Sequence, residues 1–209
     1  MKLYLIAGGN LSREEFFFRV REALEGGVDW VQVRVKDPEE SRSITREIKK
    51  LKEYFNFKLI VNDFPDVALK AGADGVHLGE GDPSPGEVRK FFKGIIGVSC
   101  YDDLSRARRA QEAGADYVAF GSLFPTETKK NYRIVKPQVI LEARRVLKVP
   151  ICVIGGIKRE NIDQVLSLRP DMIAISSAIF LAPSPRREAS FFKRKMLYYL
   201  SSKPLKEGK

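Results

Sequence analysis

The chain has few of the residues that mark several protein classes. It has two cysteines, Cys100 and Cys152, and a single histidine, His77. One histidine cannot support a histidine metal cluster. No apolar run approaches the length of a membrane span, and no secretory apolar segment follows the N-terminus. We therefore expect a protein of the reduced cytoplasm with no membrane segment.

Positive charge is in excess, but it is concentrated at one end. The net charge is +10, and residues 186–209 hold eight Lys or Arg against two acidic residues, so +6 of it lies there. A basic excess can indicate nucleic-acid binding. No base-reading motif accompanies it, and solvated surface explains most of it. We expect no nucleic-acid partner, while another polyanion stays open.

Short apolar runs alternate with helix-like segments along the 209 residues, a length that allows one α/β barrel or two small domains. Helix starts are indicated by Ser12 with Glu15, Asp37 with Glu40, Ser84 with Glu87, and Ser184-Pro185. Strands are expected over residues 3–7, 29–34, 59–62, 75–78, 95–99, 117–120, 151–154 and 172–176.

A short repeat organises this alternation. Gly-Val-Asp-Trp-Val (27–31), Gly-Ala-Asp-Gly-Val (72–76) and Gly-Ala-Asp-Tyr-Val (114–118) each place glycine at a helix end before an apolar strand, and 169–173 is a degenerate fourth copy. One further βα unit separates successive copies, so four copies indicate eight units. This predicts a single (β/α)8 TIM barrel over residues 1–209, with a frayed tail from about residue 202. A doubly wound sheet is the competitor, but no GxGxxG motif supports it.

The last predicted helix carries apolar side chains at helical spacing, which indicates a face toward the core. These side chains are Ala189, Phe192, Met196 and Tyr199.

The strand expected over residues 29–34 carries polar side chains on one face. Strict alternation puts three valines on one side and Gln32, Arg34 and Lys36 on the other. The valines can pack under the helices, which directs the polar side chains into the barrel mouth. Cations buried there need an anion. We prefer a bound anionic ligand to a structural ion pair.

Two carboxylates follow neighbouring strands. Asn62-Asp63 closes the strand over residues 59–62, and Asp82 follows the strand over 75–78. Active sites of these barrels gather at the C-terminal strand ends, and one or two carboxylates plus ligand phosphate suit Mg²⁺. Capping of the next helix is an alternative of nearly equal weight for Asp63 taken alone. His77 is expected to be a satisfied core residue rather than a base.

Small residues close the remaining strands. Ser99 offers a hydroxyl at the mouth, with no Ser-His-Asp arrangement to support nucleophilic catalysis. Gly155-Gly156 and Ser176-Ser177 close the last two strands. Small residues let backbone N–H groups approach a phosphate, and a phosphate site after strands seven and eight recurs in barrels. Tight packing is the alternative for each pair alone; together they favour phosphate.

The stretch from Tyr117 to Lys130 is the most distinctive. Its apolar run breaks at Gly121 into a loop with two threonines and two lysines, Thr126, Thr128, Lys129 and Lys130. Hydroxyl and ammonium groups suit a phosphate-bearing ligand. On this stretch alone a solvated basic loop is favoured, but the other strand ends carry matching chemistry.

These motifs, in this order, resemble the thiamine phosphate synthase family. The resemblance runs from about residue 29 to residue 180, and the loop with Thr126, Thr128 and Lys129 is its most specific part. The segments that carry it are Gln32-Val-Arg-Val-Lys36, Val-Asn62-Asp63, Gly-Val-His-Leu-Gly-Glu-Gly-Asp82, Gly-Val-Ser99, Phe-Gly-Ser-Leu-Phe-Pro-Thr-Glu-Thr-Lys129-Lys, Ile-Gly-Gly156-Ile and Ser-Ser177-Ala-Ile.

The resemblance implies a Mg²⁺-dependent transferase that joins hydroxymethylpyrimidine diphosphate to a thiazole phosphate and releases pyrophosphate. It implies a dissociative substitution through a pyrimidine carbocation, which needs no strong base. The residues implied to hold the pyrimidine diphosphate are Gln32, Arg34, Lys36, Asn62, Ser99 and Lys129. Those implied for the thiazole phosphate are Thr126, Thr128, Gly156, Ser176 and Ser177, and those for Mg²⁺ are Asp63 and Asp82. The residues implied to be catalytic are Arg34, Lys36, Ser99 and Lys129. Of these, the three cations can neutralise the charge that develops on the leaving diphosphate.

Two positions depart from the family pattern. Val35 stands where the family usually has Glu, on the helix-facing side of its strand. Residues 7–9, Ala-Gly-Gly, replace a more acidic start after the first strand, near the expected pyrimidine. A sister family isomerises the thiazole phosphate with a histidine where this chain has Ser122, so synthase is favoured over tautomerase. An inactive phosphate-binding or nucleic-acid-binding barrel is the non-enzymatic alternative, and an oligomer stays possible.

Overall fold

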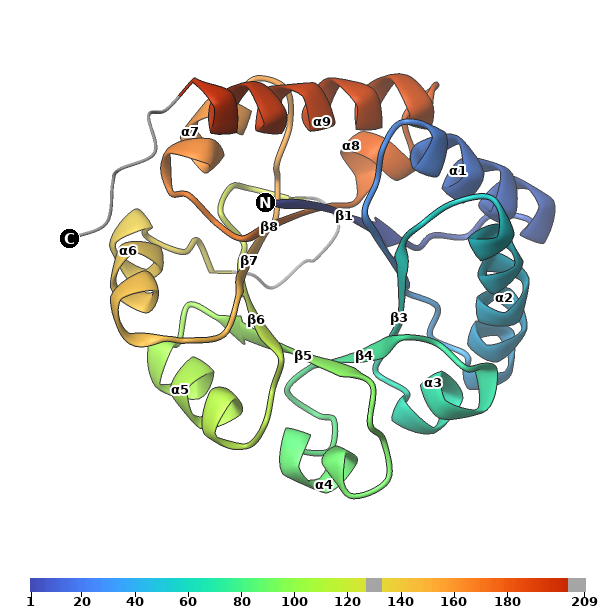
Figure 1. The fold of residues 1–209 in the computed structure, drawn as a ribbon, viewed down its shortest axis with the longest axis horizontal. Helices are drawn as coiled ribbons and strands as arrows, with labels where there is room; N and C mark the ends of the chain where they lie inside the picture. Colours follow the sequence, from blue (N-terminus) through green and yellow to red (C-terminus); the bar gives the residue numbers. More distant parts are fainter. Residues whose placement is uncertain (127–132, 203–209) are drawn as a thin grey trace.

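The strands form one closed barrel. The computed structural model describes residues 1–126 and 133–202. Parallel strands pair in chain order from β1 to β8, and β8 closes on β1. Figure 1 looks along the barrel and shows the helices as an outer ring. The predicted (β/α)8 barrel is confirmed.

Every strand lies within two residues of its predicted range. The strands are β1 (Lys2–Ala7), β2 (Trp30–Val33), β3 (Lys58–Asn62), β4 (Gly75–Leu78), β5 (Ile95–Tyr101), β6 (Tyr117–Gly121), β7 (Ile151–Ile154) and β8 (Met172–Ile175).

The helices follow the strands, with one short addition. They are α1 (Arg13–Glu25), α2 (Pro38–Lys50) with the 3-10 turn η1 (Leu51–Glu53), α3 (Pro65–Ala71), α4 (Pro85–Arg89), α5 (Leu104–Glu112), α6 (Pro137–Val146), α7 (Ile162–Ser167), α8 (Ser177–Phe180) and α9 (Pro185–Ser201). The sequence reading did not anticipate α8. A short extra helix after the last strand is typical of phosphate-binding barrels.

Predicted capping residues begin several helices. Ser12 Oγ accepts the backbone N–H of Glu15 at 3.2 Å, and Asp37 accepts that of Glu40 at 2.8 Å. Only the pair Ser84 and Glu87 forms the reciprocal capping box among the described residues. The carboxylate of Glu15 accepts from Arg19 instead.

Alternation along each strand separates two apolar clusters. Val31 and Val33 lie in the cluster between strands and helices, and Val35 packs at its edge. The second cluster fills the barrel interior and includes Tyr4 and Tyr117. On the inward face of β2, Gln32 is buried. The predicted faces of β2 are therefore confirmed as far as the strand extends.

The repeated aspartates tie the strands together at their N-terminal ends. Each carboxylate accepts a backbone N–H from the preceding strand, and each Asp N–H donates back to that strand. The carboxylate bonds join Asp29 to Leu3 (2.7 Å), Asp74 to Leu59 (2.7 Å), Asp116 to Ile96 (2.7 Å) and Asp171 to Ile151 (2.8 Å). Their cationic partners are Lys193, Lys52, Arg89 and Arg144, respectively. The repeat therefore serves stability at the rim where barrels do not carry active sites.

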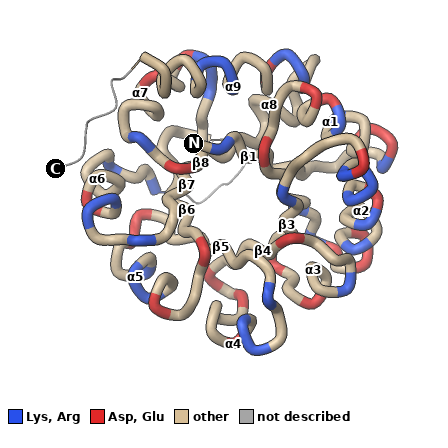
Figure 2. The backbone as a smooth tube through the Cα atoms, in the orientation of Figure 1, with Lys and Arg blue, Asp and Glu red and all other residues tan. Residues whose placement is uncertain are grey.

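The last helix packs as predicted. Ala189, Phe192 and Met196 are buried, and Tyr199 packs partly buried against the same cluster. Residues 203–209, most of the predicted frayed tail, lie outside the described part of the chain. Figure 2 shows Lys and Arg interspersed with Asp and Glu around the outer helices. Among the described residues, no helix has the length and apolar character needed to cross a membrane.

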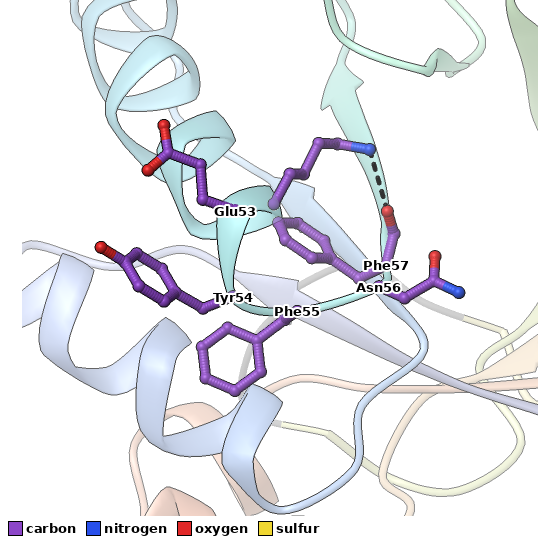
Figure 3. A pocket seen from close by; sticks show the side chains of 6 residues that line it. Glu53, Tyr54, Phe55, Asn56 and Phe57 are labelled. Atoms are coloured by element: carbon purple, nitrogen blue, oxygen red, sulfur yellow. Dashed lines mark hydrogen bonds between the residues drawn. The ribbon is translucent and has the colours of Figure 1, made fainter.

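One hollow at the N-terminal rim is lined by the loop that leads into β3 (Figure 3). Its lysine, Lys52, donates to the carbonyl of Phe57 at 2.9 Å and pairs with Asp74 at 2.6 Å. The ammonium group therefore makes both of these interactions within the fold. Barrels of this kind carry their active sites at the opposite rim.

Candidate active site

The two predicted metal ligands converge at the C-terminal rim. Gly79 donates its backbone N–H to Asp82 Oδ2 at 2.6 Å. A Cβ added to Gly79 would lie 3.4 Å from Asp82 Oδ2 and 3.9 Å from Asp63 Oδ1. The end of β3 and the loop after β4 therefore direct their carboxylates at one point.

Asp63 has an unusual backbone conformation. Its φ is +66°, in the left-handed region that Asp and Asn tolerate better than most residues. Its N–H donates to the carbonyl of His77 at 2.9 Å. The N-cap of α3 is Phe64, with no side-chain capping bond, so Asp63 does not cap this helix. The capping alternative is wrong for Asp63, and backbone strain of this kind clusters at functional sites.

The two carboxylates lie close enough to repel each other. Burial, and then the charge of Asp82, raise the pKa of Asp63 to about 6, while Arg34 and Asn62 act against this. In the described ranges, no group of three or more His, Cys, Asp or Glu residues could hold a metal ion. Two carboxylates completed by water and ligand phosphate are a donor set that Mg²⁺ accepts. The residues present therefore fit Mg²⁺ bound together with a phosphorylated ligand.

Arg34 lies at the mouth, whereas Lys36 lies further along the loop. Arg34 donates its backbone N–H to Ala7 at 2.8 Å, and its charge lowers the pKa of both Asp63 and His77. Both cationic side chains are exposed. β2 ends at Val33, three residues before Lys36, so the predicted inward orientation of Lys36 lies beyond the strand and stays a prediction.

Ser99 and His77 are hydrogen-bonded below the carboxylates. His77 Nε2 lies 2.9 Å from Ser99 Oγ, and its Nδ1 lies 2.8 Å from the Tyr117 hydroxyl. Burial, with a smaller contribution from Arg34, lowers the pKa of His77 to about 4. The imidazole is therefore neutral near pH 7 and fully bonded. The prediction of a satisfied core histidine is confirmed.

Arg106 of α5 joins this rim without having been predicted. It donates from Nε to the Ser99 carbonyl at 2.7 Å and from a terminal nitrogen to the Gly79 carbonyl at 3.0 Å. It thus fixes the ends of β4 and β5 relative to each other. A strand-end search misses it because the residue lies in the first turn of a helix. The helix start signalled by Asp103 was the available clue.

The glycine pair after β7 serves packing. A Cβ on Gly156 would lie 2.4 Å from the Pro125 carbonyl, and one on Gly155 would lie 2.0 Å from Ser122 Oγ. Both glycines have positive φ. The tight-packing alternative is therefore supported, because neither position has room for a Cβ. The absence of side chains at these glycines lets the loops after β6 and β7 come together.

The serines after β8 differ from each other. Ser176 Oγ donates to the Ile6 carbonyl at 3.1 Å, which commits its hydrogen to β1. Ser177 is exposed as the first residue of α8. Thr126 is partly buried at the end of the described loop, and Thr128 and Lys129 lie outside the described residues.

The chain is similar to known proteins along most of its length. The family model described as thiamine monophosphate synthase matches residues 3–179. The chain is 37% identical over 202 residues to the thiamine-phosphate synthase of Thermoplasma acidophilum, covering 96% of this chain and 94% of the relative. It is 39% identical over 197 residues to that of Nitrosococcus oceani, covering 92% and 91%.

A solved structure extends the likeness to three dimensions. Thiamine phosphate pyrophosphorylase from Pyrococcus furiosus superposes with a TM-score of 0.86 and 33% identity, covering 95% of this chain and 96% of that one. Sequence and fold agree over nearly the whole barrel. The chain belongs to the thiamine monophosphate synthase family.

Proposed function

We propose that the protein is a thiamine phosphate synthase. It joins hydroxymethylpyrimidine diphosphate to thiazole phosphate, giving thiamine phosphate and pyrophosphate. The observation that carries this proposal is the convergence of Asp63 and Asp82 beside Arg34 and Ser99, in a chain of this family.

The reaction exchanges one bond at the pyrimidine methylene carbon. The carbon–oxygen bond to the diphosphate breaks and its electron pair leaves with the diphosphate, while the thiazole nitrogen lone pair forms the new carbon–nitrogen bond. Arg34, Lys36 and Lys129 would neutralise the leaving charge. Binding both fragments in one mouth makes their encounter nearly unimolecular.

Hydroxyl, amide and backbone groups would hold the two substrates. Gln32, Asn62 and Ser99 would contact the pyrimidine diphosphate. The thiazole phosphate would be held by Thr126, Thr128, Gly156, Ser176 and Ser177. The position of α8 after β8 supports this second assignment.

Asp63 and Asp82 would hold Mg²⁺. When bound, the ion would supply positive charge to the diphosphate oxygens. The raised pKa of Asp63 supports the assignment, because a cation relieves the repulsion that raises it.

The tautomerase alternative lacks a suitable proton-transfer group. The pKa of His77 is lowered to about 4, and burial raises that of Cys100 to about 12. Ser122 Oγ donates to the Phe124 carbonyl at 2.6 Å, which commits it to the loop. None of the three matches a base that works near pH 7.

The direct test supplies both substrates and excess Mg²⁺ to well-folded protein. We expect pyrophosphate in equal amount to thiamine phosphate, and no release with a chelator. No product from both substrates would contradict the proposal. Metal-free turnover of the thiazole tautomer alone would support the tautomerase. Salt-sensitive nucleic-acid binding that survives removal of residues 186–209 would favour an inactive binding barrel.

The cysteines agree with a reduced compartment. Cys100 and Cys152 are both free and buried. Free thiols are typical of reduced settings, so the cytoplasm is the proposed location. The proposed partners are the two small phosphorylated substrates.

A further inference from the structure

A chain of hydrogen bonds crosses the barrel interior beneath the mouth. Four of its five members are buried, and Ser99 is half-buried at its upper end. The bonds are Gln32 Nε2 to Tyr4 Oη (2.7 Å), Tyr4 Oη to Tyr117 Oη (2.9 Å), Tyr117 Oη to His77 Nδ1 (2.8 Å) and His77 Nε2 to Ser99 Oγ (2.9 Å). It links β2, β1, β6, β4 and β5. Both ends are predicted contacts of the pyrimidine diphosphate.

With Gln32 as the first donor, one arrangement of the hydrogens uses every hydroxyl donor between Gln32 and His77. The Gln32 amide nitrogen donates to Tyr4, whose other hydrogen-bond partner among the described residues is Tyr117. Each hydroxyl has one hydrogen, and both phenolic hydrogens find an acceptor in the chain if Tyr4 donates to Tyr117 and Tyr117 donates to His77 Nδ1. Burial raises the pKa of both phenols, which keeps these hydrogens in place.

This arrangement of donors selects one histidine tautomer. Because Nδ1 accepts, the hydrogen of the neutral ring is on Nε2, and Nε2 donates to Ser99 Oγ. The Ser99 oxygen is then held by His77, and its own hydroxyl hydrogen is free to point at an acceptor in the mouth. Arg106 fixes the Ser99 backbone at the same place.

We propose that His77 is a positioning residue that acts through Ser99. Its Nε2–H, directed by Tyr117, turns the Ser99 hydroxyl hydrogen toward an anionic oxygen of the diphosphate-bearing substrate. The identity of that oxygen rests on the proposed function. The hydrogen-bond chain is independent of the proposed function.

A matched pair of variants separates positioning from structure. In His77→Gln the amide nitrogen can reach the place of Nε2, whereas in His77→Asn the shorter side chain reaches only that of Nδ1. We expect His77→Asn to lower kcat/KM for the pyrimidine diphosphate about tenfold, the effect of one hydrogen bond to a charged group. The KM for the thiazole phosphate should change less than about twofold, and His77→Gln should restore most of the loss.

A double-mutant cycle tests the route through Ser99. If His77 acts through Ser99, His77→Asn should cost almost nothing further in a Ser99→Ala background. Losses that multiply in the double variant would overturn the proposal. So would equal damage to both substrates, or His77→Gln as impaired as His77→Asn.

The tautomer offers a readout that does not depend on activity. His77 is the only histidine, so ¹⁵N NMR of tag-free protein reports it without assignment. We expect a neutral ring with the hydrogen on Nε2, and a tautomer mixture in Tyr117→Phe but not in the exposed control Tyr54→Phe. A hydrogen on Nδ1 in the wild type would overturn the inference. If the wild type releases no pyrophosphate yet shows this tautomer, the proposed function fails and the hydrogen-bond chain stands.

Discussion

The two rims of the barrel are built in different ways. At the N-terminal rim, four copies of one motif place an aspartate between neighbouring strands, each with a cationic partner. At the C-terminal rim no motif repeats, and Asp63 and Asp82 lie together with a raised pKa for Asp63. Carboxylates at the first rim pair with cations of the fold, whereas at the second rim Asp63 and Asp82 lie close enough to raise the pKa of Asp63. Under the proposed function, the first rim serves stability and the second serves catalysis.

The largest expected effect tests the C-terminal rim. Asp63→Asn should lower turnover at least about hundredfold, because it removes charge that would hold Mg²⁺ against the leaving group. Steady-state pyrophosphate release measures this. The control Asp66→Asn alters an exposed carboxylate on α3 that pairs with Lys70 at 3.6 Å, and it should keep near wild-type activity. Activity of Asp63→Asn near that of the control would reject the metal role.

The next effect tests the N-terminal rim. Asp74→Ala leaves the Leu59 N–H without its acceptor and removes the partner of Lys52. The expected cost is about 2 kcal/mol of unfolding free energy, or about 4 to 8 °C in Tm. Turnover per folded molecule should stay within about threefold. The control Asp163→Ala breaks an exposed pair with Lys195 and should cost under about 1 kcal/mol. A large kinetic defect in Asp74→Ala would erase the distinction between the rims.

The pH dependence of stability sharpens the comparison. The pKa of Asp63 is about 6 in the fold against 3.8 for the ordinary carboxyl, so folding favours its protonated form. This contribution is complete below about pH 4 and is lost as pH rises through about 6. The free energy of unfolding of metal-free Asp63→Asn should therefore rise relative to wild type as the pH increases across that window. The difference should reach on the order of 1 kcal/mol at pH 7 for this partly exposed group.

Thermal melts from pH 4 to pH 8 in the presence of a chelator measure this gain. Asp74→Asn is the control. The carboxylate that it removes pairs with Lys52 and Lys58, so this variant should not be more stable than wild type. If the difference in stability between Asp63→Asn and wild type is the same at every pH, the charged form of Asp63 does not destabilise the fold.

The smallest effect concerns the degenerate repeat copy. Gly72 has φ of +65°, and Arg169 occupies the equivalent turn of the fourth copy with φ of +53°. Gly72→Ala should destabilise by between about 0.5 and 1 kcal/mol, since the strain exceeds the entropy gained in the unfolded chain. Arg169→Gly exchanges the same two quantities in reverse and should stabilise by a similar amount, between about 0.5 and 1 kcal/mol. Denaturant melts compare them; a loss above about 2 kcal/mol in Arg169→Gly would show a contact of the arginine that outweighs its backbone strain.

Local patterns were enough to predict the fold. The Gly-x-Asp repeat located β2, β4, β6 and β8, and alternation assigned Val31 and Val33 to the helix side and Gln32 to the interior. These features depend on neighbours in sequence, which is why they can be read from it.

The site was predicted less completely because its contacts are long-range. The hydrogen-bond chain through Tyr4 and Tyr117 joins residues 113 positions apart, and Arg106 acts from a helix. β2 ends at Val33 and α2 begins at Pro38, so strand alternation does not by itself assign the side chain of Lys36.

The most direct test of the account is a crystal structure with Mg²⁺ and pyrophosphate. We predict the metal between Asp63 and Asp82, and the pyrophosphate within hydrogen-bond distance of Arg34 and Ser99. Pyrophosphate bound instead in the arginine-lined hollow of Arg159, Arg187 and Arg194, with no metal at the two aspartates, would contradict it.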